Sequence, residues 1–295
     1  MNLEHTPRGN HSHEHAAEDI GSHDDRRDLL DAETVIPLPP SNMRMGGEHF
    51  RSDAQFRQGA LRDVDLLTEV AGLSLESRVL DWGCGAGRLA IGIKLRFGHV
   101  HSYIGVDVQQ HLVEWAESNL ADSHTKFLHV AHKNDRYNSA GAPASELPLP
   151  DAQLDLIYAY SVFSHMLDDD VRHYLREFAR VLRPGGRAFL TAFVELGVGS
   201  TRVNPGDYGA LKWSGPLHCV LYDLSGFCSL IHGAGLHIER YIHGQETDGQ
   251  SSFVIVKTER VPRSNGGHAI KCRRARSSTD AGQDAGIRAM YRSTV

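Results

Sequence analysis

Short apolar runs alternate along the chain with stretches whose apolar residues recur at helical spacing. The runs predict strands, and apolar residues three or four positions apart predict amphipathic helices. The predicted strands are 79–80, 102–107, 126–130, 154–160, 188–193, 237–243 and 252–258. The predicted helices are 52–72, one that opens at Arg88, 109–120, 168–182 and 223–234. The alternation predicts an α/β fold, and the close spacing of the last two strands predicts an antiparallel pair at the sheet edge.

A glycine loop, Gly83-Cys84-Gly85-Ala86-Gly87, connects the first strand to the helix at Arg88. Glycine at alternate positions lets the backbone turn sharply and approach a ligand closely, because no Cβ stands in the way. The N-terminal amides of the following helix point at the same ligand. The loop therefore predicts a nucleotide-type site. Its G-x-G-x-G spacing differs from the G-x-G-x-x-G of dinucleotide sites.

Two carboxylates indicate which nucleotide this site binds. Asp81 ends the first strand, where it would repel a pyrophosphate and favour a cationic ligand such as the ammonium of S-adenosylmethionine. Asp107 ends the second strand, at about the interval expected for an acid that binds ribose hydroxyls. The residues predicted to bind S-adenosyl-L-methionine are Asp81, Gly83, Cys84, Gly85, Gly87, Asp107, Val108 and Tyr160.

Four segments resemble, in order and spacing, the motifs of class I S-adenosylmethionine-dependent methyltransferases of the type 11-like kind. Segments 79–88 and 105–107 resemble the first two motifs, 147–157 the approach to the fourth strand, and 182–186 the turn before the fifth. The resemblance covers about 42–258. It implies S-adenosyl-L-methionine as cofactor, methyl transfer as the reaction, and a doubly wound, Rossmann-like, seven-stranded and mostly parallel sheet with an antiparallel edge strand.

The chemistry is expected at the carboxyl end of the fourth strand, because ligands of open α/β sheets bind there. Tyr160, Ser161 and His165 should therefore lie near the transferable methyl. A hydroxyl acceptor usually needs a base, and His165 is the candidate because its ordinary pKa lies near the working pH. Alternatively, His165 only hydrogen-bonds the backbone and fixes the loop. His218 and Tyr222 are weaker candidates.

The sequence does not identify the methyl acceptor. A small molecule, methylated on a hydroxyl, is expected, because the motif that resembles base-amino methylation is absent where the strand ends in Ala159-Tyr160-Ser161-Val162. The adenine contact also departs from the family pattern. Many relatives place an aspartate just past the third strand, whereas this chain has 131–135, Ala-His-Lys-Asn-Asp. Either Asn134 or Asp135 substitutes for it, or backbone groups alone hold the adenine.

Composition divides the chain into a body and two ends. Residues 1–35 read as a disordered, acidic, His-rich tail and 259–295 as a disordered basic tail. Between them, 36–258 is the predicted methyltransferase domain, with 194–218 as an irregular insertion that covers the substrate. The alternating histidines near the N-terminus fit a weak metal site, but a solvated tail is favoured, so no metal is predicted.

The net charge of −6 and the mildly acidic body argue against a nucleic-acid surface on the core. No apolar run reaches membrane-spanning length, and no signal peptide is evident, so a cytoplasmic protein without membrane association is expected. Two other functions stay open: a non-catalytic S-adenosylmethionine-binding regulatory protein, and a nicotinamide-dependent oxidoreductase, which Asp81 and the glycine spacing disfavour. The oligomeric state is unknown from the sequence.

Overall fold

A computed structural model describes residues 36–209 and 211–258. The predictions for the two tails fall outside these residues. The strands are β1 Arg78–Trp82, β2 Ser102–Asp107, β3 Thr125–His129, β4 Leu154–Ala159, β5 Leu182–Glu195, β6 Arg202–Val203, β7 Val220–Asp223, β8 His237–Ile242 and β9 Ser251–Val256. The helices are α1 Asp53–Ala71, α2 Arg88–Phe97, α3 Gln110–Leu120, α4 Asp168–Val181 and α5 Leu224–Gly233, with short 3-10 turns η1 Ser41–Met43, η2 Glu48–Arg51, η3 Phe163–His165 and η4 Thr247–Gly249.

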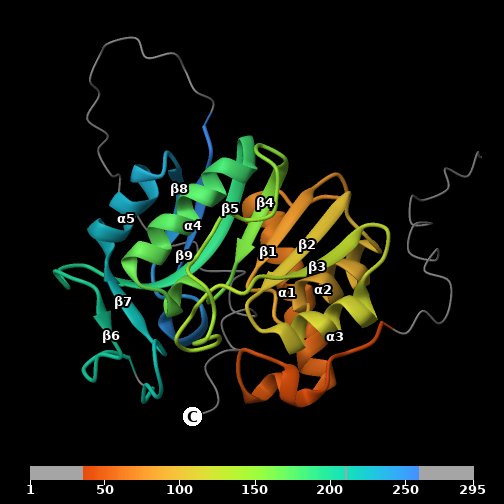
Figure 1. Cartoon of the computed structure of the whole chain (residues 1–295), viewed down its shortest axis with the longest axis horizontal. Helices are drawn as coiled ribbons and strands as arrows, with labels where there is room; N and C mark the ends of the chain where they lie inside the picture. The colour runs from red at the N-terminus through yellow and green to blue at the C-terminus, as the bar shows by residue number, and fades with distance from the viewer. Residues whose placement is uncertain (1–35, 210, 259–295) are drawn as a thin grey trace, which may run out of the picture. The chain divides into compact units, whose positions relative to one another are not determined.

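The strands form one sheet in which β3, β2, β1, β4 and β5 lie side by side and parallel (Figure 1). β9 pairs antiparallel with β5, and β8 pairs antiparallel with β9. This arrangement confirms the predicted mostly parallel α/β sheet with an antiparallel edge. The sheet has nine strands where seven were predicted. The two extra strands are β6, inside the predicted insertion, and β7, directly after it. The far end of β5 extends into the insertion and pairs with β7.

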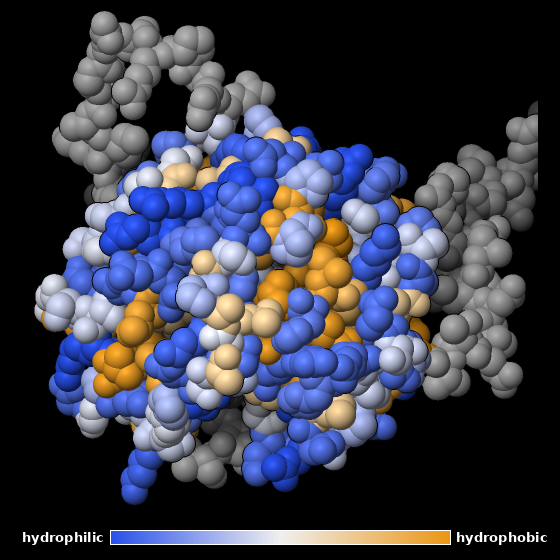
Figure 2. Space-filling view, in the orientation of Figure 1, coloured by the Kyte–Doolittle hydropathy of each residue, from blue (hydrophilic) through white to orange (hydrophobic). Residues whose placement is uncertain are grey.

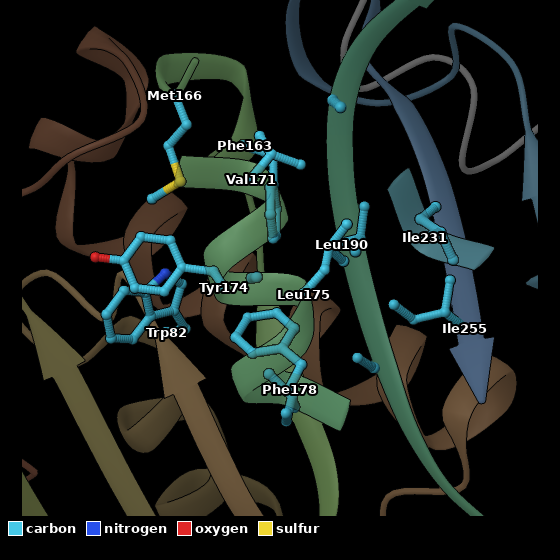
Figure 3. Packing of buried hydrophobic residues seen from close by; sticks show 14 of the residues in the cluster. Trp82, Phe163, Met166, Val171, Tyr174, Leu175, Phe178, Leu190, Ile231 and Ile255 are labelled. Carbon is cyan, nitrogen blue, oxygen red and sulfur yellow. The ribbon is translucent and has the colours of Figure 1, made fainter. Parts of the chain in front are cut away.

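Helices cover the sheet on both faces, as in a doubly wound fold. One apolar cluster joins α1, α2 and α3 to the sheet through side chains such as Leu67, Ile91 and Val113. The other joins α4 and α5 to the opposite face. Figure 3 shows the α4 side chains Tyr174 and Phe178 packed toward Trp82 of β1 and Leu190 of β5. The glycine loop therefore follows a strand that is fixed from both sides.

Local signals explain where the first helix begins and ends. The Ser52 side chain accepts a hydrogen bond from the Gln55 amide at the start of α1, and Gly72, with φ of 78°, ends it. Gly59 lies inside α1 without interrupting it. A Cβ there would come 2.5 Å from the Phe50 ring, so this glycine makes room for the segment before the helix.

Apolar side chains reach the surface at several places in the described part of the chain. In the view of Figure 1 no helix lies in front of β1, β2 and β3, and Figure 2 shows apolar surface there, where Ile104 and Leu128 are only partly buried. In the insertion, Leu196 is 74% exposed.

None of the helices in the described part of the chain has the length and apolar character needed to cross a bilayer.

Candidate active site

The glycine loop adopts a conformation that requires its glycines. Gly83, Gly85 and Gly87 have φ of 84°, 52° and 84°, in the left-handed region that other residues avoid. A Cβ on Gly83 would lie 2.4 Å from Cγ2 of Val162, so Gly83 lets the segment after β4 pack against the loop. A Cβ on Gly85 would meet only Cγ of Met45, at 3.8 Å. Gly85 is thus the point at which a ligand can approach the backbone.

Asp107 connects this loop to the end of β2. Its Oδ2 accepts a hydrogen bond from the Gly85 amide at 2.8 Å, and its Oδ1 accepts one from the Gln109 amide at 2.8 Å. Burial raises the pKa of the carboxyl above its ordinary value. Each carboxylate oxygen has a second lone pair, so the group can still accept hydroxyl donors from a ribose.

A cavity of about 570 Å³ begins immediately after Asp107. It is lined by Val108 and Gln109 after β2, by His129 and Ala131 at the end of β3, and by Tyr137 and Asn138 in the loop that follows. Its position beside Asp107 suits a purine attached to a ribose. The loop, the carboxylate and the cavity together therefore fit an adenosine-containing cofactor.

Asp81 lies below the loop. Its Oδ2 accepts a hydrogen bond from the Tyr103 hydroxyl at 2.6 Å, and burial raises its pKa to about 7. The neighbouring Arg88 forms an ion pair with buried Asp63, Nε to Oδ2 at 2.8 Å. Cys84 is also buried, and burial raises the pKa of its thiol well above the ordinary value. The side chains of Asp81 and Cys84 are thus buried beneath the glycine loop. Direct contact of either residue with the cofactor stays a prediction.

Tyr160 and Ser161 follow β4 and lie against the glycine loop through their neighbour Val162. The Tyr160 hydroxyl lies 2.8 Å from Oγ1 of Thr247 and donates to Oε2 of Glu246 at 3.2 Å. Burial of Tyr160 and the charge of Glu246 raise the pKa of the Tyr160 phenol. The β8–β9 connection therefore fixes the side chain that was predicted to face the transferable methyl.

His165 ends η3 and is buried, with 9% of its surface exposed. Its Nδ1 lies 2.9 Å from the carbonyl oxygen of Leu217, to which it donates, and the edge of the Tyr137 ring is close, with centroids 5.4 Å apart. Since Nδ1 carries the proton, the lone pair of the neutral ring is on Nε2. Burial lowers the pKa of His165 to about 4, so the ring is neutral at neutral pH.

This lowered pKa makes a prediction about stability. Between pH 6.5 and about 4, the unfolded chain binds a proton at residue 165 that the folded protein does not bind. The free energy of unfolding should therefore decrease as the pH is lowered from 6.5 to about 4. His165→Asn keeps an N–H donor for Leu217 but does not titrate. Over the same window it should lose less stability than the unmodified protein, by roughly 2 kcal/mol. Urea unfolding at pH 6.5 and 4.5 measures both, and parallel losses would contradict the burial of the ring.

The insertion lies directly against His165. Arg136 also binds the insertion: its Nη1 donates to the carbonyl oxygens of Ser214 and Pro216, at 3.1 and 3.4 Å. His218 lies in the same loop, and its Nδ1 accepts a hydrogen bond from the Ser214 amide at 2.8 Å. Tyr222 is buried in β7, where its hydroxyl donates to the carbonyl oxygens of Phe163 and Met166. The Tyr222 hydroxyl is therefore engaged in structure beside His165, and a role for His218 stays a prediction.

Residues 80–190 match the family described as "Methyltransferase domain". The 27-O-demethylrifamycin SV methyltransferase of Amycolatopsis mediterranei is 33% identical over 141 residues, which are 48% of this chain and 47% of that protein. The O-methyltransferase rstn1 of Aspergillus nomiae is 37% identical over 139 residues, 45% of this chain and 56% of that protein. Residues 80–190 thus form a methyltransferase domain of the class I S-adenosylmethionine-dependent kind.

The predicted family is thus confirmed. A solved S-adenosylmethionine-dependent methyltransferase from Leishmania major shares the fold, with a TM-score of 0.52 at 18% identity over 76% of this chain and 79% of that chain. The chain spans about half the length of the curated relatives that it matches.

Within this family, the adenine side of the site departs from the expected pattern. Asn134 Oδ1 accepts from the amides of Arg136 and Tyr137, and Nδ2 donates to the His165 carbonyl at 2.9 Å. Asp135 is exposed and pairs with Lys133 at 3.3 Å. Neither lines the cavity beside Asp107. This arrangement does not support Asn134 or Asp135 as the residue that binds adenine in place of the aspartate of many relatives. Backbone contacts to the adenine are the better interpretation.

Sequence reasoning missed several residues that shape the site. The buried Asp63 partner of Arg88 lies on α1, where only the apolar positions had been interpreted. Glu246 and Gln250 reach the end of β4 from the β8–β9 connection, more than eighty residues away in sequence. No spacing in the sequence links these positions, because strand pairing alone brings them together.

Proposed function

We propose that this methyltransferase transfers a methyl group from S-adenosyl-L-methionine to a hydroxyl of a small molecule. The observation that supports the proposal is the hydrogen bond from the Gly85 amide to Asp107, which holds the predicted ribose-binding carboxylate next to an open glycine and directly before the cavity that begins at Val108. The names of the two relatives support the hydroxyl acceptor: one is an O-methyltransferase and the other acts on a 27-O-demethyl compound.

When bound, the cofactor supplies an electrophilic methyl on a sulfonium, and the protein has to position the acceptor in line with it. In our proposal, Asp107 holds the ribose hydroxyls, the cavity beside Val108 takes the adenine, and the backbone at Gly85 approaches the methionine end. The insertion fastened by Arg136 excludes water from the acceptor side.

We infer that His165 accepts the acceptor's proton at Nε2. The Leu217 carbonyl fixes the tautomer that leaves this nitrogen with its lone pair, and the lowered pKa keeps the ring neutral at working pH. A conjugate acid with a pKa of about 4 is a weak base. It therefore works best on acceptors whose hydroxyl is itself acidic, such as phenols and enols, or whose proton leaves as the methyl arrives.

Calorimetric titration with S-adenosylhomocysteine tests the cofactor assignment. The unmodified protein should bind in the micromolar range, and Asp107→Ala should weaken binding by roughly tenfold, because it removes hydrogen bonds that a charged group makes to the ligand and to the loop. Asp107→Asn is the matched control: it retains one acceptor oxygen and should lose less.

Two results would contradict the assignment. Unmodified protein that binds NAD but no S-adenosylhomocysteine would return the chain to the oxidoreductase reading. Unchanged affinity in Asp107→Ala would remove the ribose contact. If the cofactor binds, formation of S-adenosylhomocysteine is measured with a panel of phenols and other small-molecule alcohols to identify the acceptor. Binding without any turnover would favour the regulatory alternative.

A further inference from the structure

Ser161 has an unusual backbone conformation at the edge of the candidate site. Its φ is 56°, in the left-handed region that residues with a Cβ rarely adopt. It directly follows Tyr160 at the carboxyl end of β4 and precedes Val162, whose side chain packs onto Gly83. Strained backbone of this kind persists only where surrounding groups enforce it, and it concentrates at functional sites.

A closed ring of hydrogen bonds enforces the conformation of Ser161. The Ser161 amide donates to Oγ1 of Thr191 at 2.7 Å, and the Thr191 hydroxyl donates to Oε1 of Gln250 at 2.7 Å. Gln250 completes the ring by donating from Nε2 to Oγ of Ser161 at 2.9 Å. Thr191 is fully buried and Gln250 is 1% exposed, so bulk water cannot replace either partner.

The ring also orients the Ser161 hydroxyl. Because Oγ accepts from Gln250, the hydroxyl proton must point elsewhere. Oγ of Ser164 lies 3.3 Å away, a long contact for two hydroxyls. The proton is therefore only weakly engaged within the protein and can be offered to a bound ligand.

The connection that carries Gln250 also holds the neighbouring residue. Thr247 and Glu246 bind the Tyr160 hydroxyl, and Oε2 of Glu246, whose side chain is 8% exposed, lies 3.6 Å from Nη2 of Arg62 on α1. Tyr160 and Ser161, which follow β4, are thus both held by residues 246–250 in the β8–β9 connection. This connection lies far away in the sequence but next to the site in space, since β9 pairs with β5 and β5 with β4.

We propose that Gln250 is a positioning residue of the cofactor site, which holds Ser161 in its left-handed conformation so that the segment 160–162 faces the methionine end of the cofactor. The inference rests on the proposed function. If Gln250 is lost, Ser161 is free to relax toward ordinary backbone angles, and the binding-competent arrangement becomes a minor one. Apparent affinity then falls by the same factor as the population.

Titration with S-adenosylhomocysteine of four proteins tests this inference: the unmodified protein, Gln250→Ala, Ser161→Gly and the double variant. Gln250→Ala should weaken binding about tenfold. Glycine adopts positive φ without support and has no hydroxyl for Gln250 to hold. In the Ser161→Gly background, Gln250→Ala should therefore weaken binding by less than about threefold.

Ser251→Ala is the matched control for loss of stability. Ser251 is fully buried and adjacent to Gln250, and its Oγ accepts from the Gly244 amide at 3.0 Å, within the same connection and away from Ser161. It should bind S-adenosylhomocysteine like the unmodified protein while melting at a temperature similar to that of Gln250→Ala. Should Gln250→Ala fail to fold, Gln250→Met fills a similar volume without any amide to bond Thr191 or Ser161, so the same loss is expected.

The outcomes separate the inference from the proposed function. Unmodified protein that binds no S-adenosylhomocysteine overturns the proposed function itself. Binding by the unmodified protein with equal affinity in Gln250→Ala overturns only the role of Gln250. An equal loss from Gln250→Ala in both backgrounds, or a matching loss in Ser251→Ala, also overturns it, because the effect would then be general weakening of the β8–β9 connection.

Discussion

His165→Ala should lower kcat on a hydroxyl acceptor by roughly 100-fold or more, because a positioned general base contributes about that much to proton transfer. Affinity for S-adenosylhomocysteine should stay within about twofold, since the ring lies on the insertion side of the site and bonds to Leu217, not to the glycine loop. Steady-state kinetics with an acceptor from the screen, together with calorimetry, measure the two quantities separately.

His165→Asn distinguishes the two roles considered for this residue. Leu217 has a positive φ of 46°, and its carbonyl oxygen accepts the hydrogen bond from Nδ1 of His165, so the ring also supports a strained part of the insertion. Asparagine can donate to the same carbonyl but has no Nε2. If His165 is the base, alanine and asparagine are equally inactive. Activity restored by asparagine would assign the residue to holding the loop and would remove the base from the mechanism.

The sequence predicted the parts of the site whose signal is local. The glycine loop, Asp107 and the end of β4 each adjoin an apolar strand, and parallel strands place their carboxyl ends at one edge of the sheet. That rule alone brings Asp107 beside Gly85 and Val162 beside Gly83, as the structure has them.

What the sequence could not predict depends on pairing between distant segments. β6 is two residues long, Arg202–Val203, and has no pattern of its own; it is a strand only because β7 lies next to it. The hydrogen-bond ring that holds Ser161 consists of Ser161 after β4, Thr191 in β5 and Gln250 just before β9. No periodicity connects three such positions.

Burial changes the chemistry of residues that the sequence proposed for the site. Asp81 is at the predicted strand end, but it is buried beneath the loop with Tyr103, and its pKa of about 7 leaves it only partly ionised at neutral pH. The argument from its charge to a cationic ligand therefore weakens, whereas family membership stands on the wider match. His165 shows the same limit, because its ordinary pKa had suggested a titrating base and its buried ring is neutral down to about pH 4.

Gly92→Ala should destabilise the fold by roughly 3 kcal/mol, at the upper end of what overpacking costs. Gly92 lies inside α2, and a Cβ there would stand 2.2 Å from the Ala60 carbonyl oxygen and 2.9 Å from Cγ2 of Val64 on α1. A backbone carbonyl cannot rotate out of the way as a side chain can. α1 and α2 would have to separate, which the close packing of a protein interior resists.

Gly233→Ala is the matched opposite. Gly233 is the last residue of α5, and a Cβ there would have no heavy atom within 4 Å, so alanine meets no obstacle. It should stabilise the protein by about 0.5 kcal/mol, since alanine loses less conformational freedom in a helix than glycine does. Urea unfolding of both variants measures the two signs in one experiment. Stabilisation by Gly92→Ala would mean that α1 and α2 are not in the contact described, and the position of the glycine loop at the start of α2 would then have to be revised with them.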